Sequence, residues 1–478
     1  MIFRHLLVII LTAVVLLIQG CGGSKHVSSL THQGDGGQTD AFVNIVVEWP
    51  PSRLIPPETQ SIRLLITGVG IDKPISVRFN RPSGSAPTLV KTVRVPAGPN
   101  RLFSAIAQDA KGQIVALGNN MSDLHPGETT NVTIVMDNKL LPASVPEHIE
   151  NPEDVGLQFG IQAIVDPDDP LMGKVTFTGA IENKALVGLK PSDFIITQDA
   201  FGILVRTNPT NFRDLGPTTN PNLDIAFVLD TTGSMGEEIA GVRESVRSFS
   251  QQIAGMGFNL RLAAVTFGDV INDPDGSKDP DGNPRPVFNF SEDVEKFRSF
   301  VAGLDARGGG DDPEISLDAV LFAATSLSWR SDARKIIILI TDAVAHQRND
   351  GTEFSSVTAE EVIAELKGEF TVHVVSSERP NKMWQTNSSQ QREKVYTHLR
   401  ERQANPTYDV RNLAGPLGGV WLPLPLSGNV DLIKLGIAPL IRGSYEFKFP
   451  LMRLGRQFIN VFVQTPKGWV QLQMEVKF

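Results

Sequence analysis

Short apolar runs alternate with stretches of helical periodicity between residues 223 and 375, and this alternation is the strongest constraint on the fold. The run at 336–340 is apolar without interruption, which is typical of a parallel strand buried on both faces of a sheet. Elsewhere apolar residues recur three or four positions apart, as Val242, Val246 and Phe249 do. Strands are expected at 223–229, 260–267, 336–340 and 371–375, with helices between them. This order predicts a doubly wound α/β domain over residues 221–427.

Polar residues gather directly after the first of these strands, in the sequence Asp230, Thr231, Thr232, Gly233 and Ser234. In a doubly wound sheet the ligand site lies beyond the carboxyl ends of the strands. The carboxylate and the alternate hydroxyls can converge on one point there, because glycine allows the tight bend. Hard oxygen ligands of low total charge suit Mg²⁺, which keeps several of its waters. The loop therefore predicts a magnesium site, with Ca²⁺ or Mn²⁺ as the alternative ions.

Two later loops carry further carboxylates to the same edge of the sheet. Glycines 308–310 lead into an acidic segment, and the strand at 336–340 leads into another aspartate. The acidic residues of these loops are Asp311, Asp312, Glu314 and Asp342. A purely structural alternative is that Thr232 or Ser234 caps the helix that follows. Capping explains Ser234 but not the convergence of three acidic loops.

The spacing Asp230-x-Thr232-x-Ser234, followed in order by the glycine–aspartate loop and Asp342, resembles the metal-ion-dependent adhesion site (MIDAS) of von Willebrand factor A (VWA) domains. The resemblance covers about residues 221–427. It implies a Rossmann-like VWA domain in which Asp230, Thr232 and Ser234 bind the ion directly or through water. Glu314 and Asp342 would supply further oxygens around the same ion.

The details are most similar to the inserted domain of integrin β chains. The segment Asp311-Asp312-Pro313-Glu314 resembles that family's aspartate-x-proline-glutamate segment, and Thr341-Asp342-Ala343 with the later His346 resembles its threonine–aspartate–alanine stretch. A second metal beside the first would use Glu237, Glu238 and Asp311. Threonine stands at 232 where serine is commoner, and no threonine follows the glycine run, so Glu314 is expected to substitute for it.

The first twenty residues predict a secretory signal, because Arg4 and His5 precede an apolar run that is short for a membrane span. A retained membrane-spanning anchor is the alternative. The sequence Ile18-Gln19-Gly20-Cys21 resembles the lipobox of bacterial lipoproteins, which implies acylation of Cys21. Gly22 follows instead of the aspartate that retains such proteins in the inner membrane, so the outer membrane is the expected location. Residues 21–41 would form a flexible tether.

The flanks of the α/β domain are β-rich. Short β-forming runs separated by Pro, Gly and Asn over residues 42–140 suggest an immunoglobulin-like sandwich, as a spacer or a weak ligand module. Residues 155–220 and 428–478 each hold too few strands for a closed core. We expect them to form one β-rich body that the α/β domain interrupts. The expected fold class is thus multidomain, with a VWA domain flanked by β-sandwich modules.

Composition excludes several classes of function and of binding site. The net charge of −9 argues against nucleic acid as a partner. One cysteine excludes a thiolate zinc site, and no Ser–His pairing supports a nucleophile. The repeat at 273–283 is a solvated hairpin or a Ca²⁺ loop. We expect a non-enzymatic, lipid-anchored envelope protein that binds an acidic residue of a protein ligand. The alternatives are an accessory subunit of an ATPase assembly and a structural scaffold stabilised by its metal.

Overall fold

The structure of the protein is a computed structural model. It describes residues 40–49, 56–81, 88–137, 144–200, 202–268, 271, 286–308, 313–377, 407–425 and 430–478. The predicted signal sequence, Cys21, the repeat at 273–283 and Asp311 lie outside the described residues.

The α/β domain is built on a six-stranded sheet in the order β16-β15-β14-β17-β18-β19. Its strands are β14 (Asn222–Asp230), β15 (Asn259–Phe267), β16 (Val287–Ser291), β17 (Arg334–Thr341), β18 (Phe370–Ser376) and β19 (Trp421–Pro423). Strand β16 is antiparallel to β15, and the other pairs are parallel. The chain passes from β14 first to β15 on one side and later to β17 on the other. This reversal is the place where doubly wound sheets bind ligands.

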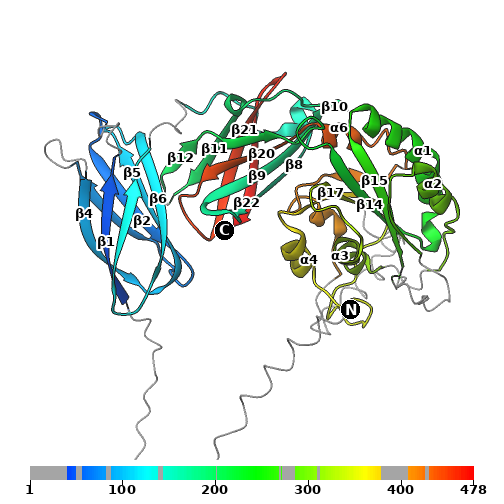
Figure 1. Ribbon diagram of the computed structural model, residues 1–478, viewed down its shortest axis with the longest axis horizontal. Helices are drawn as coiled ribbons and strands as arrows, with labels where there is room; N and C mark the ends of the chain where they lie inside the picture. The colour runs from blue at the N-terminus through cyan, green and yellow to red at the C-terminus, as the bar shows by residue number, and fades with distance from the viewer. Residues whose placement is uncertain are drawn as a thin grey trace, which may run out of the picture. The chain divides into compact units, whose positions relative to one another are not determined.

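Helices cover both faces of this sheet (Figure 1). They are α1 (Gly236–Gly255), α2 (Val294–Ala302), α3 (Ser316–Ser326), α4 (Ala359–Leu366) and α6 (Ile437–Arg442). On one face Phe227 packs with Phe249 of α1 and Phe297 of α2. On the other face Val228 belongs to a core shared with α3 and α4. Alternate residues of β14 therefore enter two different cores, which is why its sequence is continuously apolar.

The carboxyl-terminal boundary expected for the α/β domain, at residue 427, is too early. Val430 and Leu432 are buried in the same core as helix α1, as is Ile441 of α6. The hydroxyl of Ser245 in α1 donates to the carbonyl of Val430 and accepts from the amide of Leu432. The segment 430–441 thus packs in the core of the α/β domain, where it covers apolar residues of α1.

The first β module consists of two sheets, with strand orders β4-β1-β7 and β3-β2-β5-β6. Its strands are β1 (Asp40–Glu48), β2 (Ser61–Thr67), β3 (Ile75–Asn80), β4 (Thr88–Pro96), β5 (Gly98–Gln108), β6 (Ile114–Leu124) and β7 (Thr129–Val135). The tether expected over 21–41 ends too late, because Asp40 and Ala41 already belong to β1. Ala41 is buried and pairs with Val95.

The second β body combines strands from both sides of the α/β domain. One sheet has the order β10-β9-β20-β13, with β8 paired to β9, and the other has the order β12-β11-β21-β22. The strands before the α/β domain are β8 (Leu157–Asp166), β9 (Asp169–Ile181), β10 (Lys184–Ala185), β11 (Phe194–Asp199), β12 (Leu204–Thr207) and β13 (Thr210–Asp214). Those after it are β20 (Ser444–Pro450), β21 (Arg456–Thr465) and β22 (Gly468–Lys477). The aromatic rings of Phe177, Phe194 and Phe447 pack in the core between the sheets.

Candidate metal centre

The candidate site lies at the carboxyl ends of two neighbouring strands. Asp230 is the last residue of β14, and Thr341 is the last residue of β17. The two strands pair in parallel from Leu223 with Arg334 onward, so their ends meet at one edge of the sheet. Both end residues are fully buried.

Hydrogen bonds fix both carboxylate oxygens of Asp230. Oδ1 accepts from the backbone N–H of Thr232 at 2.9 Å and from its hydroxyl at 2.7 Å. Oδ2 accepts from the hydroxyl of Thr341 at 2.7 Å. The loop after β14 is itself held by the bond from the Gly233 amide to the carbonyl of Gly308, 2.9 Å away. The loop after β14 is therefore held to Gly308 through backbone, and to the end of β17 through the side chains of Asp230 and Thr341.

Ser234 connects the same loop to Asp342. Its hydroxyl donates to Oδ1 of Asp342 at 3.0 Å. Neither Thr232, which precedes the short 3₁₀ turn, nor Met235, which precedes α1, makes a side-chain capping bond to the helix. The capping alternative is thus wrong, because both hydroxyls are directed at carboxylates.

Burial shifts the pKa of Asp230. Removal from water, the largest cause, raises the pKa of Asp230 to about 6, and the charge of Asp342 acts in the same direction. The hydrogen bonds from Thr232 and Thr341 oppose this rise. A buried carboxylate near a second carboxylate is the environment in which a cation replaces the proton.

Glu314 is placed on the rim of the same edge by backbone pairing. Its amide donates to the carbonyl of Val344 at 2.9 Å, and its carbonyl accepts from the amide of His346 at 2.8 Å. Its side chain is 2% exposed. The structure thus brings the backbone of Glu314 beside the loop that follows Asp342.

The acidic pair expected at a second metal lies in the first turn of α1. Glu237 is exposed and Glu238 is buried, while Asp311 falls outside the described residues. Among the residues that the structure describes, no group of three or more His, Cys, Asp or Glu side chains is arranged to hold a metal ion. A cation here would therefore depend on two carboxylates together with hydroxyls and water. That oxygen set fits Mg²⁺ better than a softer transition metal.

The sequence alone did not reveal the roles of two residues near this edge of the sheet. Thr341 was noted only as part of a motif, yet its hydroxyl orients Asp230. His346 entered only through the family resemblance, and the structure pairs it with a carboxylate: its Nδ1 lies 2.5 Å from Oδ2 of the buried Asp350. The spacing of four residues between His346 and Asp350 was the available signal for this pair.

The α/β domain is similar in sequence to known proteins. The sequence profile of the von Willebrand factor A domain family matches residues 224–412. Human integrin beta-4 is 24% identical over 170 residues, which is 31% of this chain and 9% of that protein. Human integrin beta-6 is 23% identical over 229 residues, which is 43% of this chain and 28% of that protein. The chain therefore spans less than a third of the length of either relative.

A solved von Willebrand factor type A structure from Catenulispora acidiphila aligns with 67% of this chain and 72% of its own, at 12% identity and a TM-score of 0.30. The profile match lies on the doubly wound domain and begins within β14. Residues 224–412 are therefore a von Willebrand factor A domain, similar in sequence to part of the integrin β chains.

Proposed function

We propose that the protein binds protein ligands through a divalent cation held by Asp230, Thr232, Ser234 and Asp342, with Glu314 as a further oxygen. VWA domains are typically interaction modules, and the related integrin β chains support this general role. When bound, the cation would offer a coordination position to an Asp or Glu side chain of the partner. The protein's own part is to hold the oxygens in place and to leave one coordination position open to exchange.

One observation carries the proposal. The hydrogen bonds Thr341–Asp230 and Ser234–Asp342 join the ends of β14 and β17 into one cluster of oxygens. Asp230 and Asp342 together can balance the charge of a divalent ion. The remaining coordination positions fall to neutral hydroxyls and exchangeable water, and a carboxylate of the partner can replace such a water. Mg²⁺ is the ion we propose, with Ca²⁺ and Mn²⁺ to be compared with it.

The proposal places the protein on the bacterial cell envelope, anchored in the outer membrane through acylated Cys21. The lipobox-like sequence before Cys21 supports this location. No helix in the described part of the chain is long and apolar enough to span a bilayer. More than one acyl chain would give lasting attachment, since each buried methylene contributes about 0.8 kcal/mol. Membrane fractionation of a Cys21→Ser variant tests the anchor separately from the metal centre.

The metal-dependent function is tested in two steps. Isothermal titration with Mg²⁺ should show one site in the wild-type protein and none in Asp230→Ala. Pull-down from envelope extracts should then recover a partner in Mg²⁺ but not in EDTA, and not with Asp230→Ala. Asp332→Ala is the matched control, because Asp332 is exposed on the same domain and hydrogen-bonds to Asn222 far from Asp230. Equal recovery by wild type and Asp230→Ala contradicts the proposal.

A structural role for the metal is the second candidate, and the burial of Asp230 favours it. In that case EDTA lowers the melting temperature while recovery of the partner is unchanged. Thermal denaturation and pull-down measured on the same samples separate the two roles.

A further inference from the structure

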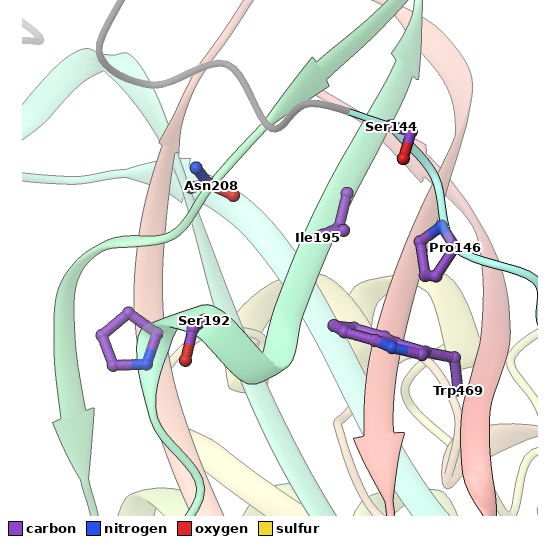
Figure 2. A pocket seen from close by; sticks show the side chains of 7 residues that line it. Ser144, Pro146, Ser192, Ile195, Asn208 and Trp469 are labelled. Carbon is purple, nitrogen blue, oxygen red and sulfur yellow. The ribbon is translucent and has the colours of Figure 1, made fainter.

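We propose that the second β body carries a binding site for neutral sugar units, centred on Trp469 of β22. The site is a hollow of about 500 Å³ on the outer surface of this body, within the usual size range of ligand pockets. Figure 2 shows Trp469 beside Pro146 and Ile195, with Ser192 and Asn208 on the other side of Ile195. No residue of the α/β domain lines it. The proposal is therefore independent of the metal centre.

Strand register explains why Trp469 is available on this surface. Trp469 pairs with Gln464 of β21, and Phe462, two residues earlier in β21, pairs with Ile195. Paired residues lie on the same face of a sheet, as do residues two apart in one strand, so Trp469 and Ile195 share a face. The residues of opposite parity, Val463 and Val470, are fully buried in the core of the body. The face that carries Trp469 is therefore the outer one.

The chain segment before β8 shapes one wall of the hollow. The amide of Ile149 donates to the carbonyl of Trp469 at 2.8 Å, which fixes the segment along β22. The ring of His148 packs edge-on against Phe462, with centroids 4.8 Å apart. These contacts place Pro146 and Ser144 at the edge of the hollow. The wall is thus held by backbone pairing and by an aromatic contact.

The chemistry of the lining selects the ligand class. None of the lining side chains is ionisable, so a phosphate, carboxylate or amine gains no counter-charge there. An indole ring offers a flat apolar face, which matches the C–H face of a pyranose. Asn208 and Ser192 can both donate and accept hydrogen bonds, as sugar hydroxyls do.

An apolar or proline-rich ligand fits this lining less well. Among the described residues, none hydrogen-bonds to the side-chain amide of Asn208 or to the indole N–H of Trp469. A ligand without hydroxyls would remove water from these groups and leave them unpaired, which is unfavourable. A neutral oligosaccharide satisfies both the ring face and the polar rim.

The test uses the full-length chain in detergent, titrated with maltohexaose, cellohexaose and chitohexaose as uncharged probes. A heparin oligosaccharide and a polyproline peptide are the charged and apolar comparisons. We expect at least one neutral probe to bind, in EDTA as well as in Mg²⁺. Binding should weaken tenfold or more in Trp469→Ala, and Trp469→Phe should restore part of it.

Phe458→Ala is the matched control. Phe458 is 54% exposed and lies on the same face of β21, but it does not line the hollow, so its loss should leave affinity within twofold of wild type. Thermal melting of each variant confirms that it is folded. The proposal is overturned if no neutral probe binds, if Trp469→Ala binds as well as wild type, or if the peptide or heparin binds in preference. Because the expected sugar binding does not require Mg²⁺, its absence can be distinguished from failure of the metal-dependent function.

Discussion

The hydroxyl of Thr341 is the smallest group on which the candidate metal centre depends. It donates to Oδ2 of Asp230, and it also accepts from the amide of Ala343 at 3.1 Å. We expect Thr341→Val to keep the volume but to weaken Mg²⁺ binding by about 10–100-fold, the usual effect of losing a group that orients a ligand. Isothermal titration measures the change.

Thr266→Val is the control for this substitution. Thr266 lies on the adjacent strand β15, and its hydroxyl donates to the carbonyl of Pro286 instead of a carboxylate. Its replacement should leave Mg²⁺ affinity unchanged. Similar losses in both variants would mean that the effect is general destabilisation and not misorientation of Asp230.

His373 in β18 gives the stability a defined pH dependence. Burial, with a smaller effect from the charge of Arg334, lowers the pKa of His373 to about 3. The unfolded chain therefore binds the extra proton between about pH 6.5 and 3, and the folded protein does not. The free energy of unfolding should fall with decreasing pH in this window by up to about 1.4 kcal/mol per pH unit from this group.

Urea denaturation at several pH values checks this dependence in wild type and His373→Gln. The variant should lose the slope contributed by one proton. His125→Gln makes the same change at an exposed position and should keep the wild-type slope. An unchanged slope in His373→Gln would show that other groups take up the proton.

Much of the metal centre could be predicted residue by residue, because spacing after a strand decides which oxygens reach the sheet edge. Asp230, Ser234 and Asp342 lie where that argument placed them, although whether they bind a metal stays a prediction. The role of Thr341 could not be predicted, since it depends on the register of two strands more than a hundred residues apart in sequence. The register is a tertiary property and leaves no local signal.

At the scale of elements, β14 joins two different charged environments. Asp224 lies near the start of β14. It is fully buried and accepts hydrogen bonds from both Arg261 and Arg330. Burial alone would raise the pKa of Asp224, but these bonds together keep it below its ordinary value. Asp230, at the other end of the strand, has no arginine among its hydrogen-bond partners in the described residues. Asp224, at the start of β14, is therefore structural, while Asp230, at its end, has the character of a binding residue.

We expect Asp224→Ala to lower the free energy of unfolding by about 3–5 kcal/mol, because it leaves two partly buried arginines without their carboxylate. Asp332→Ala, at an exposed position nearby, should change it by less than about 0.5 kcal/mol. Urea denaturation compares the two variants. The folded fraction of Asp224→Ala should bind Mg²⁺ with wild-type affinity, and reduced affinity would contradict the separation of the two ends of β14.

The helices and buried strands of the α/β domain were predictable as elements, because their apolar periodicity reflects burial on one or two faces. Strand β6 has a weak local signal because its second half, including Asn119, Asn120 and Asp123, is polar. Its ladder with β5 holds it in place. The signal of strand β8 is weak for a similar reason, since glutamines and a glycine interrupt its apolar residues. Pairing partners far along the chain supply what the local sequence lacks.

At the scale of the whole molecule, the second β body depends on strands that are separated by the α/β domain. Strand β20 lies between β9 and β13, and β21 lies between β11 and β22. The sequence suggested this division from incomplete sets of strands. It did not show that 430–441 belongs to the α/β core, because short apolar segments fit either body.

The inserted arrangement leads to a prediction about truncation. A chain that ends at Gly443 loses β20, β21 and β22, so both sheets of the second body lose a central strand and the core loses Tyr445, Phe447 and Val461. We expect trypsin to digest residues 157–214 rapidly in this chain. The α/β domain keeps its whole sheet and helix α6, and should resist digestion and bind Mg²⁺. A chain that lacks residues 1–143 is the control, because it retains all strands of the second body and should protect 157–214. Protection of that segment in the chain that ends at Gly443 would show that the second body is stable without its carboxyl-terminal strands.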